Sequence, residues 1–80
     1  MEEHTMTVSY KKLWKLLIDK DMKKVDLERK AHITHYALGQ LSLGKDVSTE
    51  VIRKICLTLD CTPDDIMEFI PDNEEMATEQ

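Results

Sequence analysis

Apolar residues recur at helical spacing along the first part of the chain. From residue 10 to residue 20 they follow the i, i+3, i+4, i+7 pattern of a single helix face. The residues that form this face are Tyr10, Leu13, Trp14 and Leu17. Ser9 precedes them and offers a hydroxyl suited to a helix N-cap. The pattern therefore predicts a first helix over about residues 10–20.

Two shorter helices are predicted in the stretch 24–45, which reads K-V-D-L-E-R-K-A-H-I-T-H-Y-A-L-G-Q-L-S-L-G-K. The first covers about 24–31, and a tight turn follows at His32 and Ile33. The second runs over 35–42, with Thr34 as its N-cap and Gly44 supplying a left-handed residue after its end. Two helices this short with so tight a turn form a helix-turn-helix unit. The residues expected to pack inward are Ala31, Ile33, Leu38 and Leu41.

The second half of the chain predicts two more helices. Ser48 is expected to cap a helix over 49–59. The inner face of that helix would consist of Val51, Ile52, Ile55 and Leu59. The sequence T-P-D-D at 62–65 combines a hydroxyl cap, an N1 proline and first-turn acids, which predicts a fifth helix over 63–69. This helix would bury Ile66 with Phe69 or Ile70 and stop at Pro71. We expect an all-α fold, a compact five-helix bundle.

Length and composition agree with one small helical domain. The chain has 80 residues, of which 41% are hydrophobic and 34% charged, and only two Gly and two Pro argue against an all-β fold. We expect a flexible N-terminus at 1–8, the helical domain at 9–70 and an acidic C-terminal tail at 71–80. No apolar stretch is long enough to span a bilayer, so no membrane association is expected. The first residues do not resemble a signal peptide, which favours a cytoplasmic location.

The net charge of -5 is unevenly distributed along the chain. Residues 1–10 carry -2, residues 11–46 carry +4 and residues 47–80 carry -7. The basic charge therefore coincides with the helix-turn-helix, whereas the acidic half is free to face solvent or a protein partner.

Other chemistry has little support in the sequence. Cys56 and Cys61 lack metal-ligand spacing and are interpreted as buried or half-buried free thiols that would not easily bridge. His32 and His35 flank a helix boundary without an accompanying acid or thiol, so no metal site is expected. No phosphate-binding glycine loop and no catalytic spacing of Ser, His and acid occur. We therefore expect no catalytic residues, no enzyme activity and no cofactor.

Through the order and spacing of four segments, the chain resembles the Cro and lambda-repressor type of helix-turn-helix domain, also called the XRE family. They are L-E-R-K-A-H-I-T at the turn, L-G-Q-L-S-L-G-K through the third helix, V-S-T-E-V-I-R-K-I-C-L-T-L-D-C in the fourth and D-D-I-M-E-F in the last. The resemblance covers about residues 9–70 and is greatest to small single-domain bacterial regulators. It implies double-stranded DNA as the partner, with the helix over 34–42 in the major groove.

The resemblance also assigns roles to individual residues. His35 and Tyr36 take the first positions that face base edges, and Gln40 can pair bidentately with adenine. Four residues are assigned to phosphates: Lys23, Lys24, Thr34 and Lys45. The chain departs from the family pattern at four positions. Lys23 replaces a frequent hydroxyl cap, His32 replaces the glycine usual in the turn, Gly39 interrupts the recognition helix, and Leu43 replaces a basic or polar residue. These departures make the DNA-facing surface less basic than is usual in the family.

The resemblance predicts a sequence-specific transcriptional regulator, a repressor or autoregulator. One module buries too little surface for tight specific binding, so a homodimer on a palindromic site is expected. The fourth and fifth helices, with Met67, Phe69 and Ile70, are the candidate dimer surface. The alternative is a protein-binding helix-turn-helix module, such as an antitoxin or an accessory regulatory subunit, that uses its acidic C-terminal half. A small-molecule sensor is a weaker alternative because no second domain or pocket is evident.

Overall fold

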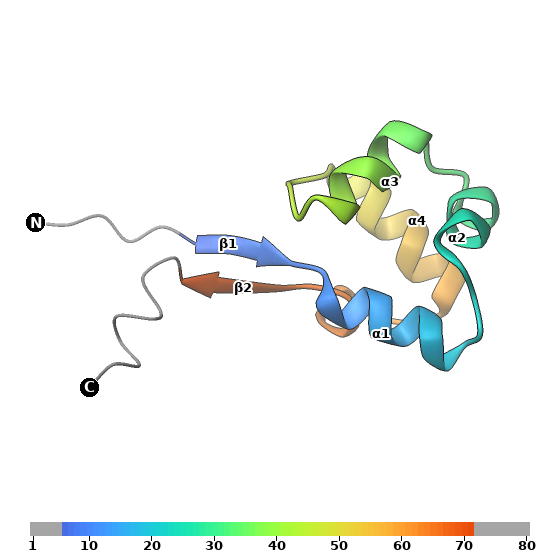
Figure 1. Ribbon diagram of the computed structural model, residues 1–80, viewed down its shortest axis with the longest axis horizontal. Helices are drawn as coiled ribbons and strands as arrows, with labels where there is room; N and C mark the ends of the chain where they lie inside the picture. Colours follow the sequence, from blue (N-terminus) through green and yellow to red (C-terminus); the bar gives the residue numbers. More distant parts are fainter. Residues whose placement is uncertain (1–5, 72–80) are drawn as a thin grey trace, which may run out of the picture.

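The computed structural model describes residues 6–71 and arranges them as a cluster of helices from which a two-stranded ribbon projects (Figure 1). The described residues form four α-helices, one 3₁₀ turn and two strands. In chain order these are β1 (Met6–Ser9), α1 (Lys11–Asp19), α2 (Lys24–Ala31), α3 (His35–Ser42), α4 (Thr49–Leu59), η1 (Pro63–Asp65) and β2 (Glu68–Pro71). The fold is thus mostly helical with a small antiparallel sheet.

The predicted all-α bundle of five helices is wrong at its last element. The T-P-D-D signal starts a single 3₁₀ turn, η1, in which Asp65 accepts hydrogen bonds from the backbone and hydroxyl of Thr62 at 3.0 and 3.2 Å. The chain then extends into β2. A helix this short gains little on its own in water, whereas an extended segment pairs with β1 along residues 68–71. The capping signal was correct about where a turn starts but carried no information about its length.

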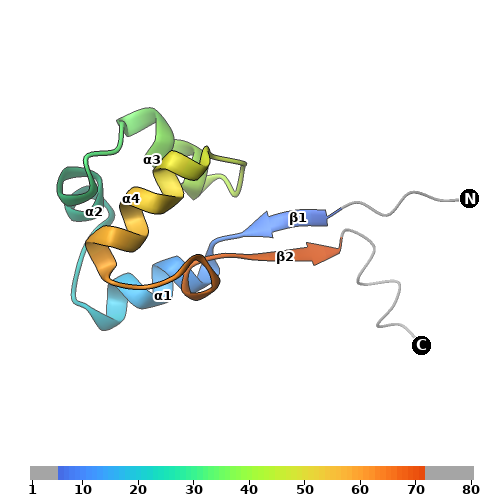
Figure 2. The same cartoon turned by 180° about the vertical axis from the view of Figure 1, so that it is seen from behind.

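The ribbon joins the two ends of the described chain. β1 and β2 run antiparallel, and Met6 lies opposite Pro71 while Ser9 lies opposite Glu68. Figure 2 shows the same ribbon from behind, again leading away from the helices. Residues 6–8, expected within a flexible N-terminus, are therefore part of a strand, and Pro71 belongs to β2 rather than to the tail. The rest of both expected terminal segments, 1–5 and 72–80, lies outside the described residues.

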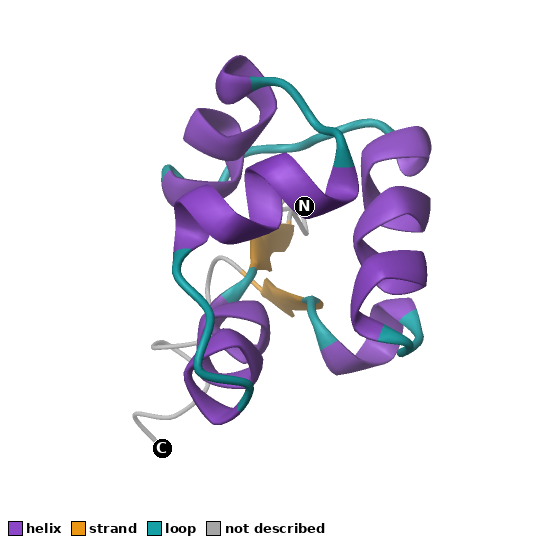
Figure 3. Cartoon of the chain, turned by 90° about the vertical axis from the view of Figure 1, so that its right-hand side faces the viewer, coloured by secondary structure: helices purple, strands orange, loops and turns teal. Residues whose placement is uncertain are grey.

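A single hydrophobic core connects the helices with the base of the ribbon. Figure 3, viewed from the helical end, shows the helices grouped around the ribbon, which lies behind them. The buried members of this core are Val8, Tyr10, Leu13, Leu17, Leu27, Ala31, Ile33, Ala37, Leu41, Ile52, Ile55, Leu59 and Ile66. The helical periodicity predicted most of this set. Phe69 is the main error, since it lies in β2 with 61% of its surface exposed, whereas Val8 was missed because it belongs to a strand.

Helix ends follow the expected capping chemistry in the middle of the chain. The Thr34 hydroxyl accepts from the Ala37 N–H at 3.0 Å, and the Ser48 hydroxyl accepts from the Val51 N–H at 3.2 Å. Gly44 has φ of 75°, the left-handed conformation predicted for it. α2, α3 and α4 consequently have the predicted bounds. α1 starts one residue later than predicted and ends one residue earlier, with no side-chain cap on its first turn.

Candidate nucleic-acid interface

The turn between α2 and α3 is closed by backbone contacts. His32 takes a left-handed conformation with φ of 58°, and both its N–H and that of Ile33 point to the Glu28 carbonyl. Ile33 is buried, which fixes the direction in which α3 leaves the turn. Lys54 on α4 donates to the His32 carbonyl at 3.4 Å. A histidine thus occupies the usual glycine position at the cost of some backbone strain.

The start of α2 is organised by an acid three residues into the helix. Asp26 accepts from the Lys23 backbone N–H at 3.0 Å and from the Arg29 guanidinium, also at 3.0 Å. These two hydrogen bonds, in that order, hold the pKa of the Asp26 carboxyl below its usual value. Lys23 therefore contributes its backbone rather than a hydroxyl to the cap, and its side chain is exposed.

α3 has one buried face and one open face. The buried face carries Ala37, Leu38 and Leu41. With about 100° between successive residues, the centre of the opposite face falls among Tyr36, Gly39 and Leu43. Tyr36 is 75% exposed and Leu43 is 69% exposed.

The three residues predicted to face bases differ in how far they are exposed. His35 and Tyr36 are exposed on the first turn of α3, as expected. Gln40, expected to be the best base reader, is half-buried and lines a hollow of about 310 Å³ together with Asp46 and Ser48. The role of Gln40 in base reading stays a prediction. Gly39 and Leu43, which the sequence marked only as departures from the family pattern, lie nearer the centre of the open face, as the helical period over 35–43 indicates.

His35 is held from the neighbouring helix. Its Nδ1 lies 3.2 Å from a carboxylate oxygen of Glu28 on α2, while 91% of the His35 side chain stays exposed. The contact restrains the imidazole without covering it. It also brings a carboxylate next to the open face of α3, which disfavours a phosphate at that position.

The predicted phosphate-binding lysines differ in their surroundings. The Lys24 ammonium lies 4.3 Å from the centre of the Trp14 ring and donates to the Ser42 hydroxyl at 3.3 Å. It therefore links α1, α2 and the end of α3. Lys23 and Lys45 are exposed at the two sides of the helix-turn-helix. Trp14 is half-buried against the core, consistent with the expectation that it packs rather than stacks on a base.

Tyr10 has a role that its helical spacing did not reveal. Its hydroxyl donates to the Lys45 carbonyl at 2.8 Å, which fastens the loop after α3 to the start of α1. Burial, followed by the negative charge of Asp46, raises the pKa of the phenol, and a hydrogen bond from the Val47 backbone opposes the shift. The only sign of this contact in the sequence is that Tyr10 carries a hydroxyl at the edge of an apolar pattern. A buried tyrosine hydroxyl usually needs a hydrogen-bond partner.

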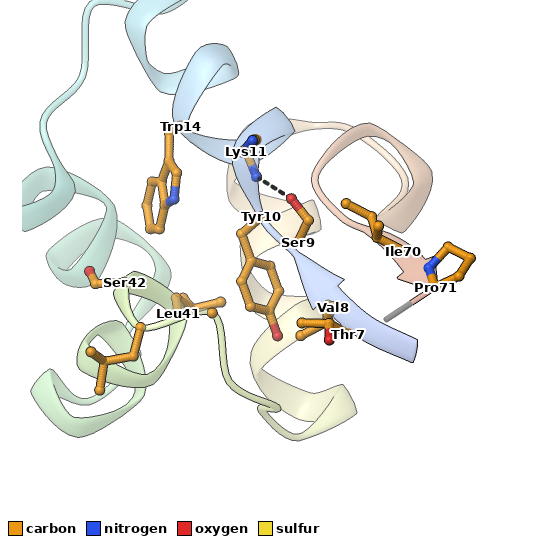
Figure 4. Close-up of a pocket in the computed structure, with 12 residues that line it drawn as sticks. Thr7, Val8, Ser9, Tyr10, Lys11, Trp14, Leu41, Ser42, Ile70 and Pro71 are labelled. Atoms are coloured by element: carbon orange, nitrogen blue, oxygen red, sulfur yellow. Dashed lines mark hydrogen bonds between the residues drawn. The ribbon is translucent and has the colours of Figure 1, made fainter. Parts of the chain in front are cut away.

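Next to this hydrogen bond, the ribbon, α1 and the end of α3 enclose a hollow of about 460 Å³. Figure 4 shows Tyr10, Trp14 and Leu41 lining it, with Val8 and Ile70 on the ribbon side. The surface of this hollow is mainly apolar. At its edge the Lys11 backbone N–H donates to the Ser9 hydroxyl, as the dashed line in Figure 4 marks. No cluster of charges or metal ligands points into it.

Cys56 and Cys61 are free and half-buried, as predicted. They lie closer than predicted, because Asp60 adopts a left-handed conformation and the Cys61 N–H returns to the Cys56 carbonyl at 3.0 Å. Burial, the neighbouring Cys56 thiol and its hydrogen bond raise the pKa of Cys61 to about 11. Thiols kept protonated in this way are poor nucleophiles at neutral pH.

Residues 6–71 contain no group of three or more His, Cys, Asp or Glu placed to hold a metal ion. None of the helices in this range combines the length and the apolar character needed to cross a membrane. His32 and His35 in particular lie in separate contacts, one at the turn and one against Glu28.

Comparisons with known proteins agree with this geometry. No curated protein sequence matches the chain. A crystal structure of the transcriptional regulator VanUg is similar over 90% of this chain and 96% of its own, with 40% identical residues and a TM-score of 0.83. Residues 12–72 match the model of a family described as the Cro/C1-type helix-turn-helix DNA-binding domain. The match covers α2, α3 and α4 in full and α1 from its second residue, and the chain therefore belongs to the Cro/C1-type helix-turn-helix DNA-binding domain family.

Proposed function

We propose that this protein is a sequence-specific transcriptional regulator, acting as a repressor, that reads the major groove with α3. The observation that carries the proposal is the open face of α3. That face is rigidly presented, because Thr34 caps the helix and Leu38 and Leu41 anchor its other side. Such a helix fits the width of the major groove of B-DNA.

The residues around α3 supply the two kinds of contact that specific binding needs. His35, Tyr36 and Gln40 contact base edges from the first two turns of the helix. Lys23, Lys24, Lys45 and the N-terminal end of α3 at Thr34 hold phosphates on either side. All 11 lysines and arginines lie within residues 6–71, whereas six of the 16 acids lie outside that range, so residues 6–71 carry a net charge of +1.

Repression follows from occupancy, because a protein seated on a promoter competes with the polymerase for the same DNA. Two copies related by a two-fold axis would place two α3 helices about one helical turn of DNA apart. The candidate dimer surface is the apolar side of the ribbon, where Met6 and Phe69 are 57% and 61% exposed. Large apolar side chains exposed on a two-stranded ribbon favour a partner that covers them.

The test is selection of bound duplexes from a random DNA pool by the purified protein at low and moderate salt. We expect enrichment of a palindrome, with affinity falling steeply as salt rises because binding releases counterions from phosphates. Binding without enrichment, or no binding, would reject the proposal. The favoured function would then be a protein-binding module, for which salt should have little effect on an apolar contact.

Paired substitutions separate base reading from phosphate binding. We expect Gln40→Ala to change the selected sequence and Lys24→Ala to weaken all sequences alike. Lys24 also contacts Trp14 and Ser42, so Lys23→Ala is the matched variant in which an exposed lysine is removed. If Gln40→Ala leaves the selected sequence unchanged, Gln40 does not read bases.

A further inference from the structure

Gly39 sits in the middle of α3, where glycine is an unfavourable choice. Glycine destabilises a helix interior relative to alanine, because it loses more backbone freedom on folding. Its φ is not in the left-handed region, which among the described glycines only Gly44 occupies. A Cβ built on Gly39 would meet nothing within 4 Å. The folded protein by itself therefore gives no reason for a glycine at this position.

The surroundings of Gly39 indicate what the missing side chain leaves room for. Tyr36 lies one turn before it and Leu43 one turn after it, both on the open face and both mostly exposed. Because Gly39 has no Cβ, the helix backbone is left uncovered near the centre of that face, between an aromatic residue one turn before it and an aliphatic residue one turn after it. We call this uncovered position the notch. An apolar notch of this kind suits a methyl-sized group and offers nothing to a phosphate.

Resting on the proposed function, we infer that Gly39 is a specificity-determining residue whose notch receives the C5-methyl group of a thymine. This methyl is what distinguishes thymine as an apolar contact in the major groove. Tyr36 and Leu43 contact it from either side and exclude water from it. An alanine methyl at position 39 would occupy the same space as the thymine methyl, so alanine is incompatible with the contact.

The experiment uses the full chain and the operator obtained from the random pool. Each thymine in one half-site is replaced in turn by deoxyuridine, which keeps the base pair and removes only the methyl group. For the wild-type protein we expect one position at which the replacement lowers affinity about three- to five-fold, the magnitude of burying one methyl-sized group. The other positions should change less.

Gly39→Ala is the matched protein variant. It should fold at least as stably as the wild type, because alanine favours the helix and the space is open. On the thymine operator its affinity should fall at least ten-fold, and deoxyuridine at the identified position should restore part of the loss. Leu43→Ala, which removes one wall but keeps the notch, should reduce the preference for thymine over deoxyuridine without reversing it.

The possible outcomes distinguish a failure of the Gly39 inference from a failure of the proposed DNA-binding function. If the wild-type protein enriches no sequence, both fail. If it enriches an operator but tolerates deoxyuridine at every position, or if Gly39→Ala binds the thymine operator as tightly as the wild type, the Gly39 inference alone is wrong. A stably folded Gly39→Ala variant with an unchanged ratio of thymine to deoxyuridine affinity would overturn it as well.

Discussion

The open face of α3 and the ribbon both expose large apolar residues, but they are held in place differently. α3 is fixed by neighbours in sequence, through the Thr34 cap and the turn at His32, and by its own buried face. The ribbon is fixed by pairing between the two ends of the described chain. An interaction surface on α3 is therefore preset locally, whereas the ribbon surface depends on the rest of the fold being complete.

The largest expected effect comes from the buried side of α3. Leu41→Ala should lower the free energy of unfolding by about 2–5 kcal/mol, because it removes a side chain that is 1% exposed and leaves a cavity. Urea unfolding followed by circular dichroism measures the change. A loss below about 1 kcal/mol would mean that the core relaxes around α3 and that its face is less rigid than described.

Phe69→Ala is the matched change on the ribbon. Because Phe69 is mostly exposed, the free energy of unfolding of the monomer at low concentration should change by only about 0.5 kcal/mol. At high concentration, sedimentation should show a weaker dimer than the wild type forms. An unchanged dimer would remove the ribbon as the dimer surface.

The next effect tests the link between the two regions. Tyr10→Phe removes the hydrogen bond to the Lys45 carbonyl while keeping the ring, and should cost about 1–2 kcal/mol of unfolding free energy. Hydrogen exchange should show the loop at 45–47 opening more often than α4. Uniform loss of protection across the fold would indicate that Tyr10 supports the core in general rather than this loop.

A smaller effect is expected at the helix caps. Thr34→Ala should cost about 1 kcal/mol, because the Ala37 N–H loses its acceptor. Ser48→Ala, which removes the equivalent cap of α4, is the control for stability. Both variants should unfold at similarly lower urea concentrations, but only Thr34→Ala should weaken DNA binding beyond its effect on stability.

The smallest effect concerns alkaline pH. The pKa of Cys61 is about 11 in the folded protein against an ordinary value of 9.0, so the unfolded chain loses this proton first as pH rises. The contribution of Cys61 to stability is therefore complete below about pH 9 and lost progressively toward pH 11. This contribution is measured by comparing the urea unfolding midpoints of the wild type and Cys61→Ala at pH 8 and at pH 10.5. The difference in midpoint between the two proteins should be smaller at the higher pH.

The sequence predicted best the parts of the fold that depend on neighbouring residues. α2, α3 and α4 have the predicted bounds because Thr34, Ser48 and Gly44 act within one turn of their own helices. The site residues His35 and Tyr36 are exposed for the same reason, since a face of α3 follows from helical period alone.

The parts that the sequence did not predict depend on residues far apart along the chain. Nothing near Phe69 indicates that Val8 will lie opposite it, so a capping signal was extended into a helix that does not form. The same limit applies to Tyr10, whose partner is the carbonyl of Lys45. A local pattern reports an amphipathic helix, but it does not report which distant backbone group a buried hydroxyl will reach.

The register of the ribbon also sets an order of events during synthesis. β1 leaves the ribosome before any helix, and its partner β2 follows only after α4 and η1. Throughout that interval β1 has no strand to pair with, whereas the residues that pack the helices against one another, up to Leu59, have already been made. The ribbon can therefore close only after the helical part of the chain has been synthesised, and a chain interrupted before Glu68 would carry α3 without β2.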